Sequence, residues 1–190
     1  MKKRMFIALD ISSADKVNVA QWRKQHLDLP FKAIDENNFH VTLAFLGLLE
    51  QEKQANLTVL INQQHHLIQQ QQLRMLATQD ISFSLRLSKV GYFKKAQVLH
   101  LMPESCPHWL MYLNKVIVEL SLNSNIRLEN YRYQPHLSLY RKAKSSLIAT
   151  NNIIEKTAVT QTLNIKSFSL YHSFSSEYGV QYIPIQTWRL

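Results

Sequence analysis

Two short segments of this chain share one pattern: a histidine, any residue, a hydroxyl residue and then leucine. The first lies in residues 39–47, with His40 and Thr42, and the second in residues 135–141, with His136 and Ser138. Both runs are apolar and strand-like, and alternate residues of a strand point to the same face. Each segment is therefore predicted to present an imidazole and a hydroxyl side by side. Two such strands facing each other would give a paired acid and base with two hydroxyl donors between them.

The same order of predicted elements surrounds both segments. Around the first lie a strand at 5–9, a helix at 14–26 capped by Ser12 or Ser13, a Gln-rich helix at 50–77 and a strand at 81–87. Around the second lie a strand at 98–101, helices at 105–122 and 144–156 and a strand at 163–174. The two histidines are 96 residues apart (136 − 40). This repeat predicts an α+β fold of two pseudo-symmetric lobes, each an antiparallel sheet with helices on its outer face. The active site would lie in the central cleft of one bilobal domain, residues 1–190.

Charge and cysteine content indicate a class of partner and a compartment. The chain has 22 Lys and Arg against 13 Asp and Glu, a formal charge of +9. Such a balance favours a polyanionic partner, nucleic acid first, although a basic protein that is merely well solvated remains an alternative. Cys106 is the only cysteine, which is typical of a reducing cytoplasm. The apolar run at 5–9 is too short to enter a membrane, and nothing demands more than a monomer.

The histidine pattern alone leaves two interpretations open. About one His-x-[Ser/Thr] is expected by chance in a chain of this composition, so the pair is either catalytic or two half-buried strand histidines. The adjacent His65 and His66 diverge by about 100° on a helix, which favours a solvated face over a metal site. The remaining histidines lack partners at metal-ligand spacing and are interpreted as structural: His26, His100, His108 and His172.

Further matches place these motifs in a known family. They are the opening run Arg4 to Ala8, Phe45-Leu46-Gly47 after the first motif, Pro135 before the second, Arg141 after it, and the ending with Leu170 to Ser173, Gly179, Tyr182 and Trp188-Arg189-Leu190. Over nearly its whole length the chain resembles the two-histidine phosphoesterase superfamily, most closely the bacterial and archaeal RNA 2',3'-cyclic phosphodiesterases, or 2'-5' RNA ligase family. Ser138 departs from the usual Thr, and Tyr140 stands where a smaller residue is common.

The resemblance implies a reaction and a set of roles. His40 would donate a proton to the 3'-oxygen of an RNA 2',3'-cyclic phosphate, and His136 would accept a proton from the attacking water. Thr42, Ser138 and Arg141 would bind the phosphate, and the product would carry a 2'-phosphate. No metal or cofactor is expected, since two histidines in opposite protonation states suffice near neutral pH. Run backwards, the same site would form a 2'-5' bond.

Two other functions remain open. One keeps the chemistry and changes the substrate to a 2'-5' linked nucleotide or ADP-ribose cyclic phosphate. The other is a non-catalytic RNA-binding module with a degenerate site. Tyr133 and Tyr140 flank the second motif, where they would either stack bases or pack in the core. Candidates for contacts with an RNA backbone are Lys94, Lys95, Arg127, Arg132, Lys142 and Lys144.

Overall fold

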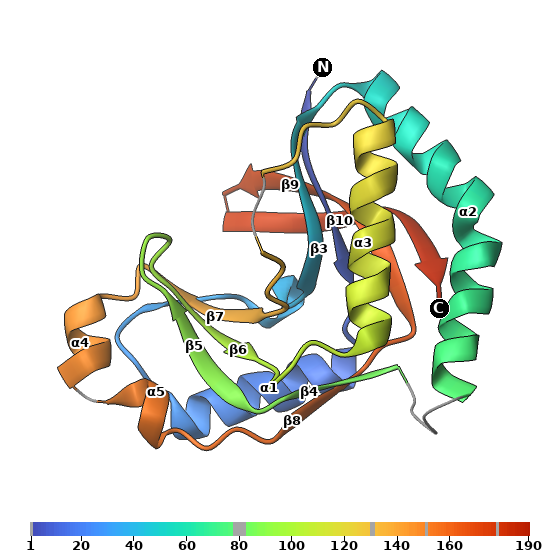
Figure 1. Ribbon diagram of the computed structural model, residues 1–190. Coiled ribbons are helices and arrows are strands. Elements are labelled where there is room, and N and C mark those ends of the chain that lie inside the picture. The colour runs from blue at the N-terminus through green and yellow to red at the C-terminus, as the bar shows by residue number, and fades with distance from the viewer. Residues whose placement is uncertain (1, 78–82, 130–131, 151, 178) are drawn as a thin grey trace.

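The computed structural model describes residues 2–77, 83–129, 132–150, 152–177 and 179–190 (Figure 1). Its strands are β1 (Lys3–Leu9), β2 (Lys32–Ala33), β3 (Val41–Leu49), β4 (Ser84–Leu87), β5 (Lys89–Phe93), β6 (Val98–Met102), β7 (Leu137–Arg141), β8 (Gln161–Asn164), β9 (Ser167–Ser176) and β10 (Gly179–Arg189). Its helices are α1 (Ser13–His26), the 3-10 turn η1 (Glu36–Asn38), α2 (Gln51–Ala77), α3 (His108–Asn123), α4 (Ser145–Thr150) and α5 (Ile153–Lys156). Within the described ranges, no helix is long and apolar enough to cross a membrane.

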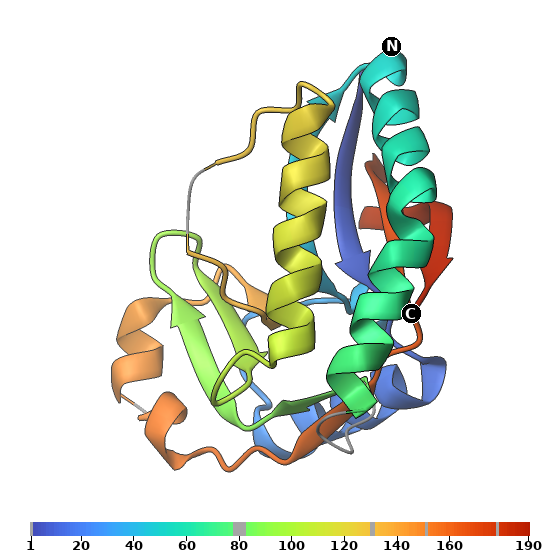
Figure 2. The same ribbon diagram turned by 45° about the vertical axis from the view of Figure 1, so that its right-hand side comes forward.

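One antiparallel sheet runs through both lobes in the order β10-β9-β1-β3-β7-β6-β5, with β2 paired to β7. β4 and β8 form a separate two-stranded sheet. In Figure 1, β10, β9, β1 and β3 form one lobe with α2 and α3 packed over them, and β7, β6 and β5 form the other with α1, α4 and α5. Figure 2 shows α2 and α3 side by side on the outside of the first lobe. The predicted α+β architecture of two antiparallel lobes with outer helices is confirmed.

The lobes do not correspond to the two halves of the chain. Helix α1 follows β1 in sequence but lies with the second lobe, where it packs against β8 of the small sheet, and α3 follows β6 but packs against β3 of the first lobe. Strand β9, from the second half, completes the first lobe by pairing with β1. Each half therefore gives its first helix to the opposite lobe. A repeated order of elements is compatible with this exchange, which depends on contacts between distant residues.

Strand β1 shows how the sheet separates its two faces. Met5, Ile7 and Leu9 are at most 1% exposed and belong to the core beneath the helices. The intervening Phe6 points to the other face and lines the cleft between the lobes. This alternation makes one face of the sheet an apolar support and leaves the other available for a site.

Several predicted boundaries need correction. Ser12 caps α1 as expected, accepting a hydrogen bond from the Asp15 amide at 3.1 Å. The N-cap of α3 is Pro107, so this helix begins at His108 rather than near residue 105. Gly47 sits inside β3 with φ of +73°, at an irregularity in the pairing with β1. The helix expected at 144–156 is divided into α4 and α5. Of the strand expected at 81–87, residues 81–82 lie outside the described residues.

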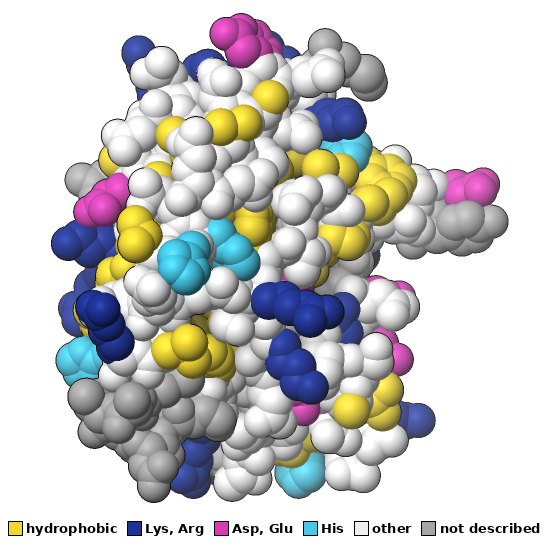
Figure 3. All heavy atoms as spheres, turned by 90° about the vertical axis from the view of Figure 1, so that its right-hand side faces the viewer, with side chains coloured by type: hydrophobic (Ala, Val, Ile, Leu, Met, Phe, Trp, Pro, Cys, Tyr) yellow, Lys and Arg dark blue, Asp and Glu magenta, His cyan; other side chains and the backbone are white. Residues whose placement is uncertain are grey.

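The face of the molecule that carries α2 is largely uncharged. Figure 3 shows this face as mostly white, with Lys and Arg side chains in a few places and some of them next to one another near the middle of the view. That agrees with the Gln-rich sequence of α2. The cleft between the lobes lies on the opposite side of the sheet.

Candidate active site

The two histidine motifs meet where the lobes join. Strands β3 and β7 pair antiparallel through Val41 and Leu137, the residues directly after the two histidines. Extending that register by one residue sets His40 opposite Ser138 and Thr42 opposite His136. Both histidines immediately precede their strands rather than lying inside them. All four side chains thus lie on one face, around a local two-fold axis.

The cleft brings all five predicted site residues together. His40, Thr42, His136, Ser138 and Arg141 all line a cavity of about 810 Å³. Val41 and Leu137 point the other way and are fully buried in the core. The junction of the two lobes is therefore both the centre of the sheet and the floor of the cleft.

A β-bulge follows each motif and redirects the next side chain. In β3, Ala8 pairs with Thr42 and Ile7 with Ala44, so Leu43 is an extra residue. In β7, His100 pairs with Ser138 and Leu99 with Tyr140, so Leu139 is extra. An extra residue reverses the alternation beyond it. The third residue after each hydroxyl therefore turns back to the cleft: Phe45 in one lobe and Arg141 in the other.

The exchanged helices hold these bulges in place. The Asn114 side chain of α3 donates to the Leu43 carbonyl at 2.8 Å. The Arg23 side chain of α1 donates to the Leu139 carbonyl at 3.1 Å, and the Ile34 amide donates to the same oxygen at 2.9 Å. Bulged backbone carbonyls would otherwise lack ladder partners, which is costly when they are buried. The helix exchange between the lobes thus supplies polar side chains to the backbone beneath the site.

Both histidines are held in the same tautomer. The Nδ1 atom of His40 lies 2.7 Å from the Asn38 carbonyl oxygen, and that of His136 lies 2.8 Å from the Gln134 carbonyl oxygen. A carbonyl only accepts hydrogen bonds, so each Nδ1 carries a proton. Nε2 is then the nitrogen of each ring that can exchange a proton with a ligand.

Aromatic rings wall each histidine. The His40 ring lies 4.9 Å from Phe6 and 5.1 Å from Tyr182 between centroids. The His136 ring lies 4.8 Å from Phe93 and 5.1 Å from His100. None of these four rings was assigned to the site from the sequence, and His100 was interpreted as structural. The sequence signal for Phe6 and Phe93 was their position on strands that flank the motifs.

Burial disfavours the charged form of both imidazoles. Burial lowers the pKa of His40 to about 4; the hydrogen bond to Asn38 opposes this shift, and the nearby positive charges of His136, Arg141 and Lys16 reinforce it. The pKa of His136 is also lowered, by burial first and by Arg141 second, against the hydrogen bond to Gln134. Both rings are therefore neutral at pH 7 before an anion enters the cleft.

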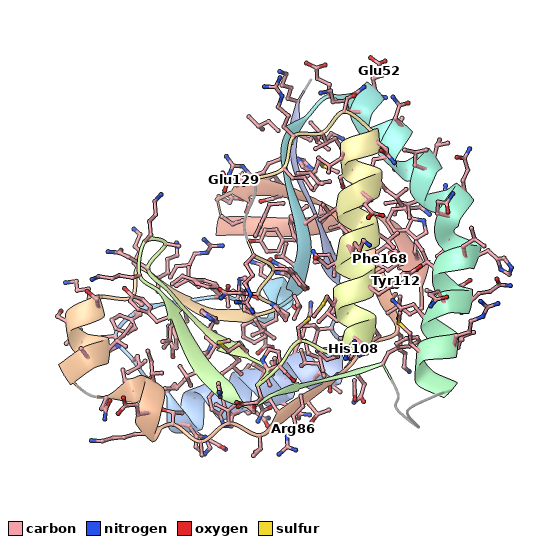
Figure 4. All side chains as sticks on the ribbon, in the orientation of Figure 1. Glu52, Arg86, His108, Tyr112, Glu129 and Phe168 are labelled. Carbon is pink, nitrogen blue, oxygen red and sulfur yellow. The ribbon has the colours of Figure 1, made fainter. Side chains whose placement is uncertain are left out.

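The cleft is positively charged. Arg4, Arg127 and Arg141 line it, and Glu129 is the one acidic residue among its described lining residues. Figure 4 shows Glu129 beside the first lobe and Arg86 on the outer side of the second, away from the cleft. Arg127 is the only one of the expected RNA-backbone residues among the described lining. The others are not seen at the cleft: Lys94, Lys95, Arg132, Lys142 and Lys144.

The two tyrosines considered for base stacking serve the scaffold. The bulge at Leu139 turns Tyr140 into the core, where its hydroxyl donates to the Leu27 carbonyl at 2.6 Å. Tyr140 stands where the family commonly has a smaller residue, but because its side chain lies in the core, this difference does not change the lining of the cleft. Tyr133 is half-buried and donates to the Thr42 carbonyl at 3.2 Å.

Among the described residues, no three His, Cys, Asp or Glu side chains cluster in a way that could hold a metal ion.

Comparison with known proteins gives consistent matches over the whole chain. Residues 6–181 match the family described as AKAP7 2'5' RNA ligase-like domain. The RNA 2',3'-cyclic phosphodiesterase of Escherichia coli K12 is 24% identical over 99% of this chain and 97% of its own length. That of Methanocaldococcus jannaschii is 25% identical over 97% of this chain and 99% of its own. The crystal structure of E. coli LigT complexed with 3'-AMP covers 100% of this chain and 99% of its own, with a TM-score of 0.79 and 23% identity.

Proposed function

The chain belongs to the AKAP7 2'5' RNA ligase-like domain family, and on that premise we propose that it hydrolyses RNA 2',3'-cyclic phosphate ends to 2'-phosphomonoesters. One observation carries the proposal: the Val41–Leu137 pairing that sets two histidine–hydroxyl pairs around one cleft. The two relatives named RNA 2',3'-cyclic phosphodiesterase support the same activity. A basic cleft suits the polyanionic substrate.

The reaction needs one proton donor and one proton acceptor on opposite sides of phosphorus. His136 Nε2 takes a proton from water as the water oxygen bonds to phosphorus. The bond from phosphorus to the 3'-oxygen breaks, and His40 Nε2 gives its proton to that oxygen. The phosphate stays on the 2'-oxygen, and solvent returns the two histidines to their starting states. An arrangement with one histidine on each side of the two hydroxyls suits such an in-line displacement.

The remaining residues hold the phosphate. Thr42 and Ser138 donate from their hydroxyls to the non-bridging oxygens, where negative charge grows in the transition state. Arg141 adds a guanidinium, whose planar fork matches phosphate oxygens. The anion also supplies the negative charge that stabilises the protonated donor, since burial alone keeps both histidines neutral.

The pH dependence of kcat/KM should reflect the lowered pKa values of the two half-buried histidines. The reactive state has one proton on the pair, and it is most populated between the pair's two pKa values. Burial lowers both, so kcat/KM is expected to peak below pH 6.5. The phosphate's negative charge raises the donor's pKa in the complex, so the alkaline limb of kcat should lie at higher pH than that of kcat/KM. Initial rates at low and saturating substrate test this; a kcat/KM optimum above pH 7.5 would contradict it.

Replacing Arg141 is expected to weaken substrate binding. Arg141→Ala removes a charge that acts on both histidines and lines the cleft, so KM should rise about tenfold, the loss of roughly one charge-assisted contact. Arg86→Ala is the matched control, because Arg86 is exposed on β4 and points away from the cleft. Steady-state kinetics on cyclic-phosphate RNA measure both; equal KM values for the two variants would remove Arg141 from the site.

The same groups permit the reverse reaction, joining a cyclic phosphate to a 5'-hydroxyl through a 2'-5' bond. Water at about 55 M makes hydrolysis the dominant direction. Comparing kcat/KM for cyclic-phosphate RNA, 2'-5' linked dinucleotides and ADP-ribose cyclic phosphate tests the substrate class. A preference for either small nucleotide would change the substrate, and salt-sensitive RNA binding without turnover would indicate a binding module instead.

A further inference from the structure

A third histidine lies directly behind His136. His100 of β6 is only 2% exposed, and its ring centroid is 5.1 Å from that of His136, with the planes at 63°. Phe93 of β5 stacks on His100 at 4.1 Å and meets the edge of His136 at 4.8 Å. The three rings contact one another, so His136 cannot turn about its side-chain bonds without displacing them.

The strands on either side make room for the His100 ring. His100 pairs with Gly91 of β5 and with Ser138 of β7. A Cβ atom on Gly91 would lie 2.4 Å from His100 Nε2 and 2.9 Å from its Cε1, so only glycine admits this ring. Ser138 is the smaller hydroxyl residue, without the methyl group of threonine. Gly91 and Ser138, the small residues on the two neighbouring strands, therefore leave space for the His100 side chain between them.

The corresponding place in the other lobe is built differently. Thr42, the counterpart of Ser138, pairs with Ala8 of β1, so alanine stands where His100 stands. A threonine beside an alanine on one side is thus replaced by a serine beside a histidine on the other. The local two-fold symmetry of the site is broken at this pair, which makes the surroundings of His40 and His136 unequal.

We propose that His100 is a positioning residue for His136: together with Phe93 it holds the His136 ring in one orientation, excludes water behind it, and distinguishes it from His40. The proposal rests on the function proposed above. Its mechanistic consequence is that His136 alone gains a proton beside another imidazole, which must stay neutral while His136 is charged.

The charges around the pair agree with this role. Burial first and the charge of His136 second lower the pKa of His100 to about 4, against a hydrogen bond to the Val98 carbonyl. The charged group that acts on the pKa of His136 is Arg141 at the end of β7, and across the junction His136 in turn lowers the pKa of His40. On β5 the residues that meet the two rings are Gly91 and Phe93, neither of which titrates. His100 therefore packs against His136 as an uncharged side chain in a positively charged site.

Two substitutions at His100 distinguish the effect of a packed ring from the effect of the imidazole nitrogen atoms. His100→Ala removes the ring, so water reaches His136, its pKa rises towards the ordinary value, and kcat falls about tenfold with KM within twofold. His100→Phe keeps a buried ring, so kcat should return to within about threefold of the wild type and the pH profile should be restored. Unchanged kcat and an unchanged His136 titration in His100→Ala would overturn the proposal, as would a loss of kcat without any shift of that titration.

NMR titration of the wild-type protein gives a readout that does not depend on catalysis or on the folding of the His100 variants. The histidine Cε1–H signals are followed with pH, and His136→Ala identifies the His136 signal. Protonation of His136 is expected to shift the His100 signal at the same midpoint; no response of His100 would overturn the proposal. Absence of cyclic-phosphate turnover by the wild type would instead reject the proposed function, leaving the coupling of the two rings to be decided by this titration.

Discussion

Replacing either His40 or His136 with alanine is expected to lower kcat by about 10²- to 10⁴-fold, the usual contribution of a positioned general acid or base. Each ring is fixed by a hydrogen bond from Nδ1 to a backbone carbonyl, which leaves Nε2 for proton transfer. Aromatic rings pack against both imidazoles and help to fix their orientation. Since donor and acceptor act in one step, the double variant should lose little more than the worse single variant.

His66→Ala is the control for these variants. His66 is exposed on α2 and contacts Gln70 of the same helix, so its removal should leave kcat unchanged. Thermal unfolding of all the variants separates lost chemistry from lost structure. A folded His40→Ala or His136→Ala protein with full activity would exclude the acid–base pair.

Removing the hydroxyls opposite the histidines should have the second-largest effect. Thr42→Val and Ser138→Ala are each expected to lower kcat by about 10²-fold, the typical loss when one donor to a developing oxyanion is removed. KM should change less, because the charge on the non-bridging oxygens grows in the transition state. Valine matches threonine in shape, so Thr42→Val removes the hydroxyl with little change in packing.

Thr42→Ser is the matched control, since it keeps the hydroxyl and removes only a methyl group. It reproduces the residue that the other motif already carries at Ser138, so most activity should remain. Steady-state rates on a cyclic-phosphate RNA compare the three variants. If Thr42→Val kept wild-type kcat while Thr42→Ser lost it, the methyl group rather than the hydroxyl would matter, and the phosphate-binding role would be wrong.

Local patterns in the sequence account for much of the fold and for the residues of the site. Alternation and capping predicted the strands and α1, and the repeat located both histidines and both hydroxyls. The two β-bulges could not be predicted from the sequence, because Leu43 and Leu139 are ordinary apolar residues. Whether either one is the extra residue of a bulge depends on its pairing with the partner strand. That is also why the sequence alone could not decide between base stacking and core packing for Tyr140.

Long-range packing explains the rest of what the sequence did not reveal. The exchange of α1 and α3 between the lobes leaves the order of elements unchanged, so a one-dimensional repeat carries no sign of it. His100 has no motif around it, and its importance arises only when β5, β6 and β7 lie side by side with Gly91 and Ser138 on either side. Local propensity does not encode such contacts.

The central claim is that the paired motifs open a 2',3'-cyclic phosphate with the 3'-oxygen as leaving group. The most direct test is to incubate the protein with an RNA ending in a 2',3'-cyclic phosphate and to determine by ³¹P NMR which ribose oxygen keeps the phosphate. The account predicts a 2'-phosphate as the product, lost when either His40 or His136 is replaced. A 3'-phosphate would contradict the assignment of donor and acceptor, and an unreacted cyclic phosphate would contradict the proposed function itself.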